Sequence, residues 1–410
     1  MGYNWLSGTR QRGTRNEEIG LPLKLGPISQ QVDRMAASFV ADEHRALLRE
    51  ARQLLHAVDA EELRAKVRDR REKYPWLVAI PVHTLSQTFS PPLPPADFSV
   101  VGSDGSSIHP DRHSPLRYYV INTSHAVLTY GRHPNADLDS EGQLYFEDDD
   151  LYVLSGQKSI PIEGERLGVK MQIAELQAAL KAAQSATDPM VALRDGTLIL
   201  WQLQNEEREV REEFLGQFLR CLDGFRAASV PVIGYISYPG SHDVANALRV
   251  SLCRDDPSDC EHCSLSEEQQ VLCDFLSRAW DRQLFEELLE EGRRSDVFES
   301  TSDILKKYES HHIQFLYLNV GGEVVRIEAP QWVMRDGGML DLVHALVCDQ
   351  CQRSPDYPPY PPALQEAHEQ AVITTAEGRL VEELVERGLA ERGIVYARSA
   401  KDRSKRRRAV

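Results

Sequence analysis

The order of apolar segments along the chain predicts an α/β fold, in which a mixed β-sheet is flanked by helices. Three strand-like apolar stretches come first, and helical and strand-like stretches alternate after them. This order is typical of a sheet with helices packed on it. The expected strands occupy residues 98–102, 118–122, 126–130, 143–146 with 151–154, 191–203, 230–236, 313–320 and 323–329. The expected helices occupy residues 163–185, 214–225, 242–252 and 277–291, and the C-terminal part beyond a Pro/Tyr-rich loop at 355–362.

Two of these elements carry clear local signals. The segment 214–225 places its large apolar residues on one helical face; they are Phe214, Leu215, Phe218, Leu219, Leu222 and Phe225. The stretches 313–320 and 323–329 flank Gly321-Gly322, a pair typical of a tight hairpin turn. Neither pattern repeats along the chain, so we expect no internal repeat.

The composition limits the possible functions. The chain has 410 residues, of which 41% are hydrophobic, enough for one large core with an appendage. It contains no apolar run of about eighteen residues and no secretory signal, so we expect a cytoplasmic protein that does not span a membrane. The net charge of −16 argues against binding phosphate backbones over the whole surface. A local groove that grips DNA remains compatible with it.

We expect three regions. Between residues 29 and 71 apolar residues recur at helical spacing among many charges, which indicates an arm of one long amphipathic helix; they are Leu47, Leu48, Leu54, Leu55 and Val58. The proline-rich segment 89–97 is interpreted as a linker, because prolines lack the backbone N–H that a helix or central strand needs. The regions are an N-terminal extension with the arm at 1–75, a main domain at 76–385 and a C-terminal end at 386–410. The basic run Lys401–Arg408 is either a solvated end or an arm that captures nucleic acid or an acidic partner.

Three carboxylates stand out. Asp104 follows an apolar strand and precedes Gly105, where a metal or substrate has room to approach; an ordinary Asp-Gly-Ser turn is the alternative. Glu175 has no lysine or arginine three or four residues away on its helix, so the usual surface ion pair is unavailable. It is either exposed by chance or directed at something that needs a carboxylate. Asp195 lies in the apolar stretch 190–200, where a buried charge needs a partner or a metal; a tight hairpin turn at Asp-Gly is the alternative.

These three acids can converge on one edge of the sheet. Oxygen ligands suit Mg²⁺ or Mn²⁺, and two such ions about 4 Å apart can activate water and stabilise the leaving oxygen of a phosphodiester. The sequence thus predicts a metal site built from Asp104, Glu175 and Asp195.

At these motifs the sequence resembles the NurA nuclease family. The resemblance extends in order over roughly residues 30–385. It rests on Val101-Gly102-Ser103-Asp104-Gly105-Ser106, Leu193-Arg194-Asp195-Gly196-Thr197-Leu198, Val325-Arg326-Ile327-Glu328-Ala329-Pro330-Gln331-Trp332 and Tyr360-Pro361-Pro362-Ala363-Leu364-Gln365-Glu366-Ala367-His368.

The resemblance implies a ribonuclease-H-like fold, a Mn²⁺-dependent nuclease that trims DNA ends, a homodimer and a HerA-type hexameric ATPase as partner. By motif position Asp104 and Asp195 are expected as metal ligands, with Glu175 as the intervening acid. Tyr360 and His368 match the family's C-terminal tyrosine and histidine.

Each of the last two residues has a simpler interpretation. His368 can ligate the ion, position the phosphate or transfer a proton, or it is an ordinary helix-face histidine. Tyr360 can bind a phosphate or stack on a base, or it packs with Tyr357. Arg326 and Glu328 alternate on a strand and are expected to pair across the sheet at most.

A cysteine-containing insertion at 253–273 departs from the family pattern. Four cysteines within it, one in a CxxC and beside His262, suit a structural Zn²⁺ or an iron–sulfur cluster. They are Cys253, Cys260, Cys263 and Cys273. Cys273 also fits a helical pattern in which a buried cysteine is common. Cys348 and Cys351 can complete such a site or compete with it.

Two other functions remain open at this point. Asp104-Gly105-Ser106 after a strand resembles the phosphate loop of actin-like phosphotransferases, with Asp195-Gly196-Thr197 as the second loop. Gly321-Gly322 is a poor version of the glycine-rich adenosine site which that fold needs. A non-catalytic scaffold that recruits a partner through its helical arm and cysteine segment is the other alternative.

Overall fold

The computed structural model describes residues 25–38, 41–70, 76–110, 116–186, 189–253 and 262–394. The chain forms two units, residues 1–47 and 48–410. None of the described helices is long and apolar enough to cross a membrane.

The expected helical arm consists of separate helices. They are α1 (Leu25–Ser38), α2 (Ala41–Ala57) and α3 (Ala60–Arg70). Asp59 explains the break between α2 and α3, because its Oδ1 accepts hydrogen bonds from the backbone N–H groups of Glu61 and Glu62 at 2.8 and 3.0 Å. An aspartate that caps a helix in this way starts a new helix and ends the previous one. The prediction of one helix over 29–71 was therefore wrong.

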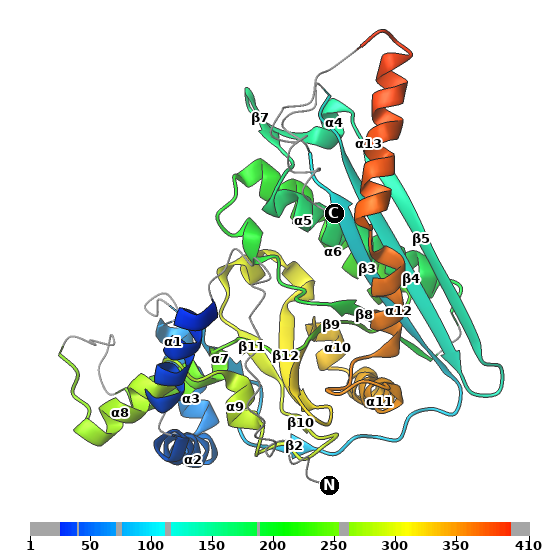
Figure 1. Ribbon diagram of the computed structural model, residues 1–410. Helices are drawn as coiled ribbons and strands as arrows, with labels where there is room; N and C mark the ends of the chain where they lie inside the picture. Colours follow the sequence, from blue (N-terminus) through cyan, green and yellow to red (C-terminus); the bar gives the residue numbers. More distant parts are fainter. Residues whose placement is uncertain are drawn as a thin grey trace, which may run out of the picture. The chain divides into compact units, whose positions relative to one another are not determined.

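Within the described residues the main unit contains one sheet of eleven strands, whose principal order is β1-β11-β12-β13-β9-β8-β3-β4-β5 (Figure 1). These strands are β1 (Ala79–Pro81), β3 (Phe98–Ile108), β4 (Tyr119–Tyr130), β5 (Asn135–Tyr145), β8 (Met190–Asp195), β9 (Val232–Ile236), β11 (Phe298–Ser300), β12 (Ile313–Asn319) and β13 (Val324–Pro330). The short strands β2 (Thr88–Phe89) and β10 (Arg294–Ser295) extend the β12 side. A separate hairpin joins β6 (Tyr152–Ser155) and β7 (Lys158–Pro161).

The strands in the order β5-β4-β3-β8-β9 form one half of this sheet. The strands β3, β4 and β5 form an antiparallel meander, and β8 and β9 run parallel to β3. The helix α5 (Glu165–Ala183) precedes β8, and α6 (Arg208–Ala227) connects β8 to β9. The structure thus confirms the predicted fold class, a mixed sheet flanked by helices.

Several strand boundaries differ from the prediction. The strand predicted at 98–102 continues to Ile108, and the two predicted at 118–122 and 126–130 are the single strand β4. The polar residues between them stay extended because β4 is paired along its length with β3 and β5. The exposed, polar first part of β5 gave no apolar signal. The stretch predicted as one strand at 191–203 ends at Asp195.

The C-terminal half contains more helices than expected. Besides α7 (Asp243–Leu252), they are α8 (Glu267–Leu276), α9 (Asp281–Phe285), α10 (Gln331–Met334), α11 (Gly337–Arg353), α12 (Pro362–Ala371) and α13 (Thr375–Ala390); the short α4 (Asp148–Leu151) lies earlier. The helix predicted at 277–291 is limited to the short α9, and Ser277 is the C-cap of the preceding α8. The expected hairpin around Gly321-Gly322 is confirmed by the pairing of β12 with β13.

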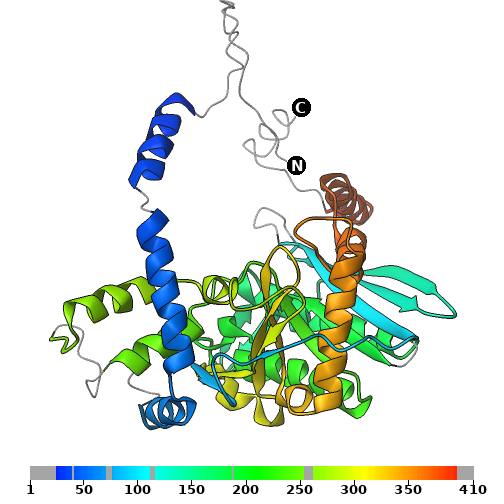
Figure 2. The ribbon, with the colours of Figure 1, turned by 90° about the horizontal axis from the view of Figure 1, so that it is seen from below.

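Helices cover both faces of the central strands. A Cβ atom added at Gly102 would meet Ala363 of α12, whereas one at Gly105 would meet Met171 and Glu175 of α5. Since successive residues of a strand point to opposite faces, α12 and α5 lie on opposite sides of β3. In Figure 2 the green helices of the middle of the chain and the orange C-terminal helices lie around the strands.

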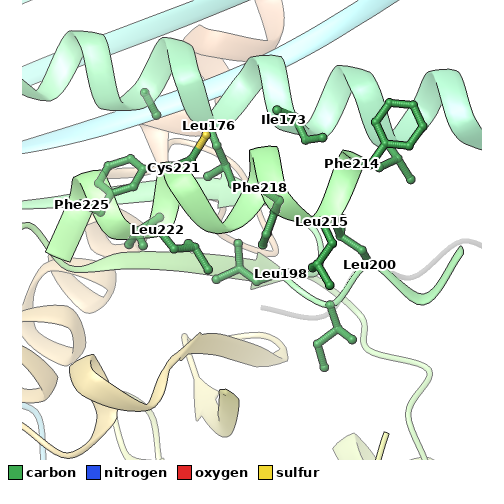
Figure 3. Close-up of a cluster of buried hydrophobic side chains, with 14 of the residues drawn as sticks. Ile173, Leu176, Leu198, Leu200, Phe214, Leu215, Phe218, Cys221, Leu222 and Phe225 are labelled. Carbon is green, nitrogen blue, oxygen red and sulfur yellow. The ribbon is translucent and has the colours of Figure 1, made fainter. Parts of the chain in front are cut away.

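Two hydrophobic cores result. On one face, α5 and α6 pack together with the segment that follows β8, and Figure 3 shows this cluster. Its labelled residues are Ile173, Leu176, Leu198, Leu200, Phe214, Leu215, Phe218, Cys221, Leu222 and Phe225. On the other face, Val100, Val191 and Leu193 pack with residues of α11 and α12. The amphipathic face predicted for 214–225 is thus the buried face of α6.

Hydrogen bonds fix α12 to the meander. Ser124 Oγ donates to the carbonyl oxygen of Ala367 at 2.5 Å, and Asn122 Nδ2 donates to that of Ala371 at 2.8 Å. At Gly102 an added Cβ would lie 2.1 Å from the carbonyl oxygen of Ala363. Only glycine allows this approach, so the position of α12 depends on residue 102.

We therefore expect Gly102→Ala to displace α12. Overpacking of this kind costs about 1–3 kcal/mol of unfolding free energy. The control is Gly168→Ala in α5, where an added Cβ has no neighbour within 4 Å and alanine favours the helix. Urea unfolding measures both, and a Gly102→Ala protein as stable as the control would contradict this account of the helix position.

A buried histidine makes the stability depend on pH. His344 of α11 lies with its Nε2 2.7 Å from the carbonyl oxygen of Gly292. Burial lowers the pKa of its ring from 6.5 to about 4. Between these values the unfolded chain takes up a proton that the folded chain does not, so falling pH favours unfolding.

From this group we expect a loss of about 2 kcal/mol of unfolding free energy between about pH 7.5 and pH 5. His344→Gln keeps an N–H donor for Gly292, but its amide does not titrate in this range. The unfolding free energy of this variant should therefore fall by about 2 kcal/mol less than that of the unsubstituted protein over the same change in pH. Urea titrations at both pH values test it. The same pH dependence in the two proteins would remove His344 as the cause.

Candidate active site

Two of the predicted acids come together through strand pairing. The strands β3 and β8 are parallel neighbours, with Ser103 opposite Arg194. The next residues along the two strands are Asp104 and Asp195, so their side chains start from adjacent positions on the same face. Asp104 lies within β3, and Asp195 is the last residue of β8. The turn considered for Asp104 is therefore absent.

The conformation at Asp195-Gly196 also differs from the hairpin considered for it. The strands β8 and β9 are parallel, so no hairpin joins them. Gly196 has a φ of +88°, and its carbonyl oxygen would lie 2.5 Å from a Cβ added at Gly234. The glycine thus lets the chain leave β8 and pass closely over β9. This turn leaves Asp195 at an open strand end.

The apolar surroundings of Asp195 in the sequence predicted a buried charge, and this was wrong. Asp195 is exposed at the end of β8, whereas its neighbour Arg194 is only 5% exposed. The apolar residues that follow are buried because they cross the sheet after the turn at Gly196. The buried charge in this motif is the arginine.

Tyr360 and His368 face the two aspartates from the α12 side. His368 Nδ1 lies 2.7 Å from Asp104 Oδ2, and the His368 side chain is 61% exposed. Tyr360 hydrogen-bonds to Asp195, and its ring packs edge-on against Tyr235 with 5.5 Å between the ring centroids. The simpler interpretation of Tyr360, packing with Tyr357, does not hold, since Tyr357 is 83% exposed.

Glu175 reaches the same region from α5, on the opposite face of β3. A Cβ added at Gly105 would lie 2.9 Å from Glu175 Oε1, so the glycine provides the space that this carboxylate occupies. Glu175 is 3% exposed, and its Oε2 accepts a hydrogen bond from Arg194 Nε at 3.0 Å. No basic residue of α5 is placed to pair with Glu175, and its ion-pair partner is Arg194 of the strand β8.

The three carboxylates influence one another. Burial is the largest cause that raises the pKa of Glu175 to about 7; Arg194 lowers it, whereas the charges of Asp104 and Asp195 add to the rise. Partial loss of hydration and the nearby Asp104 raise the pKa of Asp195, against the hydrogen bond from Tyr360. Burial and Asp195 also raise the pKa of Tyr360. The site thus concentrates negative charge that one arginine balances in part.

Arg194 links this site to a second group of buried charges. Its Nη1 donates to the carbonyl oxygen of Thr197 at 2.6 Å, and Thr197 Oγ1 donates to Glu328 Oε2 at 2.7 Å. Arg326 Nε donates to Glu328 Oε1 at 2.9 Å, and Arg326 Nη1 binds Asp243 Oδ2 at 2.5 Å. Arg326 and Glu328 thus pair along one strand, as residues two apart on the same face. Sequence reasoning passed over Arg194, although an arginine inside an apolar strand beside an aspartate is a usable signal.

The donor atoms of this site are of the type that a divalent cation prefers, with Glu175 on the face of β3 opposite to the two aspartates. Asp104, Asp195 and Glu175 Oε1 supply carboxylate oxygens, which hard cations prefer, and their mutual repulsion is what such an ion would relieve. Within the described part of the chain no three His, Cys, Asp or Glu side chains are already arranged as ligands of one ion. Here Arg194 holds Glu175 Oε2 and His368 holds Asp104.

The cysteine segment stays a prediction. Cys260 lies outside the described residues, whereas Cys253 follows α7, Cys263 precedes α8 and Cys273 lies in α8. Cys348 and Cys351 of α11 are buried in the core that α11 and α12 form with the sheet. Cys351 Sγ lies 3.7 Å from Tyr235 Oη, so these two cysteines are packing residues. The basic run 401–408 also lies outside the described residues.

Comparison with known proteins identifies the family. No curated protein matches the chain. Among solved structures, the NurA nuclease from Sulfolobus solfataricus aligns over 86% of this chain and 98% of its own, at 12% identity and a TM-score of 0.47. LC9-RNase H1, a type 1 RNase H with the type 2 active-site motif, aligns over 37% of this chain and 69% of its own, at 10% identity and a TM-score of 0.21.

The sequence model of the NurA domain matches residues 98–373, more than half of the chain. The matched segment includes all five site residues, Asp104, Glu175, Asp195, Tyr360 and His368. The match supports a nuclease. The chain belongs to the NurA family.

Proposed function

We propose that this protein is a Mn²⁺- or Mg²⁺-dependent deoxyribonuclease that hydrolyses phosphodiester bonds during DNA end processing. The observation that carries the proposal is the adjacency of Asp104 and Asp195 on the parallel strands β3 and β8. Glu175 contributes the third carboxylate from the opposite face. Asp104 raises the pKa of both Glu175 and Asp195, and a tyrosine and an exposed histidine lie beside these three acids. Such a set of groups is suited to metal-dependent phosphodiester hydrolysis.

Asp104, Asp195 and Glu175 Oε1 would hold the ion, with His368 as a further ligand or as its neighbour. When bound, the metal supplies an activated water and charge stabilisation at the leaving oxygen. Arg194 keeps Oε2 of Glu175 occupied, which leaves Oε1 as the free donor atom. Tyr360 holds the carboxylate of Asp195 in a fixed orientation.

His368 is placed to handle the proton or the phosphate. With its Nδ1 at Asp104, its Nε2 side is directed away from that carboxylate on a mostly exposed ring. A neutral ring can accept a proton at Nε2, and a charged one can donate to a phosphate or leaving oxygen. Asp104 thus orients His368 as well as serving as a proposed metal ligand.

The first test replaces the two strand carboxylates. Asp104→Asn and Asp195→Asn keep the side-chain shape but remove a charged ligand, so we expect Mn²⁺-dependent cleavage of labelled DNA to fall by more than about a hundredfold. Asp139→Asn is the matched control, because Asp139 is an exposed aspartate of β5. Circular dichroism and thermal unfolding check that the variants fold.

Unchanged cleavage by folded Asp104→Asn protein would remove the proposed mechanism. ATP turnover without DNA cleavage by the unsubstituted protein would instead favour the actin-like phosphotransferase. Folded protein with neither activity, alone or with an ATPase partner, would favour the scaffold.

The proposal includes a homodimer and a HerA-type ATPase as partner, as the family resemblance implied. The net charge of −16 opposes DNA binding over most of the surface, so we expect weak DNA affinity for the nuclease alone. An ATPase that grips the duplex would deliver the strand to the carboxylates. This division of labour reconciles an acidic protein with a polyanionic substrate.

Addition of the ATPase and ATP should therefore raise processive cleavage. The measurement is product length over time on labelled linear DNA. A complex with Asp104→Asn nuclease is the control, since it should hydrolyse ATP without cutting DNA. Equal processivity with and without the partner would contradict the proposed pairing.

A further inference from the structure

A cavity of about 540 Å³ lies away from the carboxylate site, toward the β1 edge of the sheet. Its walls come from α3, β1, β2, β10, β11 and β12, and from residues near α10 and α11. In the sheet β11 is four strands from β8, which corresponds to roughly 19 Å. None of the five proposed site residues lines this cavity.

The cavity is cationic in an acidic protein. Four arginines line it, Arg64, Arg68, Arg294 and Arg335. Two carboxylates, Asp296 and Glu299, oppose them, which leaves an excess of two positive charges. The whole chain carries a net charge of −16. This local reversal of sign needs a structural explanation.

Arg294 is the central observation. It is 6% exposed, and no carboxylate of the described residues lies within ion-pair distance of it. Its Nη1 donates to the carbonyl oxygen of Ser295 at 3.0 Å, but its Nε is buried without a hydrogen-bond partner. The guanidinium stacks on Phe89, 4.1 Å from the ring centroid. A buried guanidinium with an unused donor is costly unless an anion binds it.

The carboxylates in the cavity are already engaged. Asp296 accepts hydrogen bonds from the backbone N–H groups of Thr84 at 3.1 Å and Val297 at 2.8 Å. Glu299 accepts one from Gln314 Nε2 at 3.1 Å and lies 3.6 Å from Arg335. These contacts fix both acids in place, so neither is free to turn toward Arg294.

The other arginines differ in their freedom. Arg64 donates to the carbonyl oxygens of Pro81 and Val82 at 3.1 and 2.8 Å and pairs with Glu61, so it is engaged. Arg68 is exposed on α3. Arg294 within the cavity and Arg68 at its border are therefore the cations with capacity for an external anion. Burial also lowers the pKa of Arg294, as expected for a desolvated cation, and the charges of Asp296 and Asp341 only partly oppose this effect.

We propose that this cavity binds a phosphate group. Arginine forks match phosphate oxygens, and the excess of two positive charges equals the charge of a doubly ionised phosphate. The phosphate belongs either to a DNA backbone or to a free phosphate or nucleotide. Binding of a DNA phosphate rests on the proposed nuclease function, whereas binding of a free phosphate or nucleotide does not.

The first experiment uses inorganic phosphate with the full-length protein. Phosphate should raise the melting temperature more than sodium chloride at equal ionic strength. Arg294→Met keeps the apolar part of the side chain and should weaken phosphate binding, measured by calorimetry, by roughly tenfold to a hundredfold. Arg278→Met is the matched control, since Arg278 is an exposed arginine of the α8 end that pairs with Asp274.

Because Arg294 is buried, its replacement can disturb folding. Arg68→Met is the second variant, and as an exposed residue it should leave the fold intact while it weakens phosphate binding. Phosphate affinity equal to that of the unsubstituted protein in folded Arg294→Met protein overturns the proposal. If Arg294→Met does not fold, unchanged affinity in Arg68→Met overturns it.

The second experiment separates the two sources of phosphate. In Asp104→Asn protein, which should bind DNA without cutting it, fluorescence anisotropy measures affinity for a labelled single-stranded oligonucleotide at several salt concentrations. If the DNA backbone occupies the cavity, adding Arg294→Met should make the plot of log affinity against log salt shallower by about 0.7 for each phosphate that the cavity no longer holds. Unchanged DNA binding together with weakened inorganic phosphate binding supports the free source.

This design keeps the two proposals distinguishable. Cleavage that survives Asp104→Asn refutes the nuclease mechanism and leaves the phosphate site standing. Phosphate binding that survives Arg294→Met refutes the phosphate site and leaves the nuclease mechanism standing.

Discussion

The parallel pairing of β3 with β8 is the constraint on which the rest of the site depends. It places Asp104 beside Asp195, although ninety residues separate them in sequence. Glycines on both sides of Asp104 make the arrangement possible. Gly102 lets α12 approach one face of β3, and Gly105 leaves room for Glu175 on the other. One strand thus receives a histidine from one layer and a carboxylate from the opposite layer.

Charge balance stabilises this cluster of carboxylates. Arg194 is buried and holds Glu175, and the network through Glu328 and Arg326 to Asp243 neutralises the charges beneath it. In the cavity at the β1 edge the balance is incomplete: the charges of Asp296 and Asp341 act on the buried Arg294, but no ion pair among the described residues includes it. Buried charges need partners. At the carboxylate site the buried arginines and acids are partners of one another, whereas in the cavity at the β1 edge Arg294 still needs an anion.

Much of this could be predicted from the sequence, because its signals are local. The amphipathic face of α6 and the hairpin at Gly321-Gly322 follow from periodicity and turn chemistry. The strand β5 was largely missed because its exposed polar residues are extended only through pairing with β4. The burial of Arg194 instead of Asp195 depends on where β8 ends. The cationic cavity gave no signal, since its arginines come from distant segments.

Phosphodiester hydrolysis by an acidic protein requires cations at separate places. At the reacting phosphate, carboxylates can recruit a divalent ion, which offsets their own negative charge locally. Away from it, the chain must supply fixed positive charge to hold the strand, and most of this surface is unsuited to that task because the net charge is −16. If the phosphate that we propose for the cavity belongs to a DNA backbone, Arg294 would meet this need with little loss of side-chain entropy, since Phe89 and Ser295 already hold its guanidinium. In that case the cavity would fix the register of the strand, and the proposed ATPase partner would supply the general affinity for DNA.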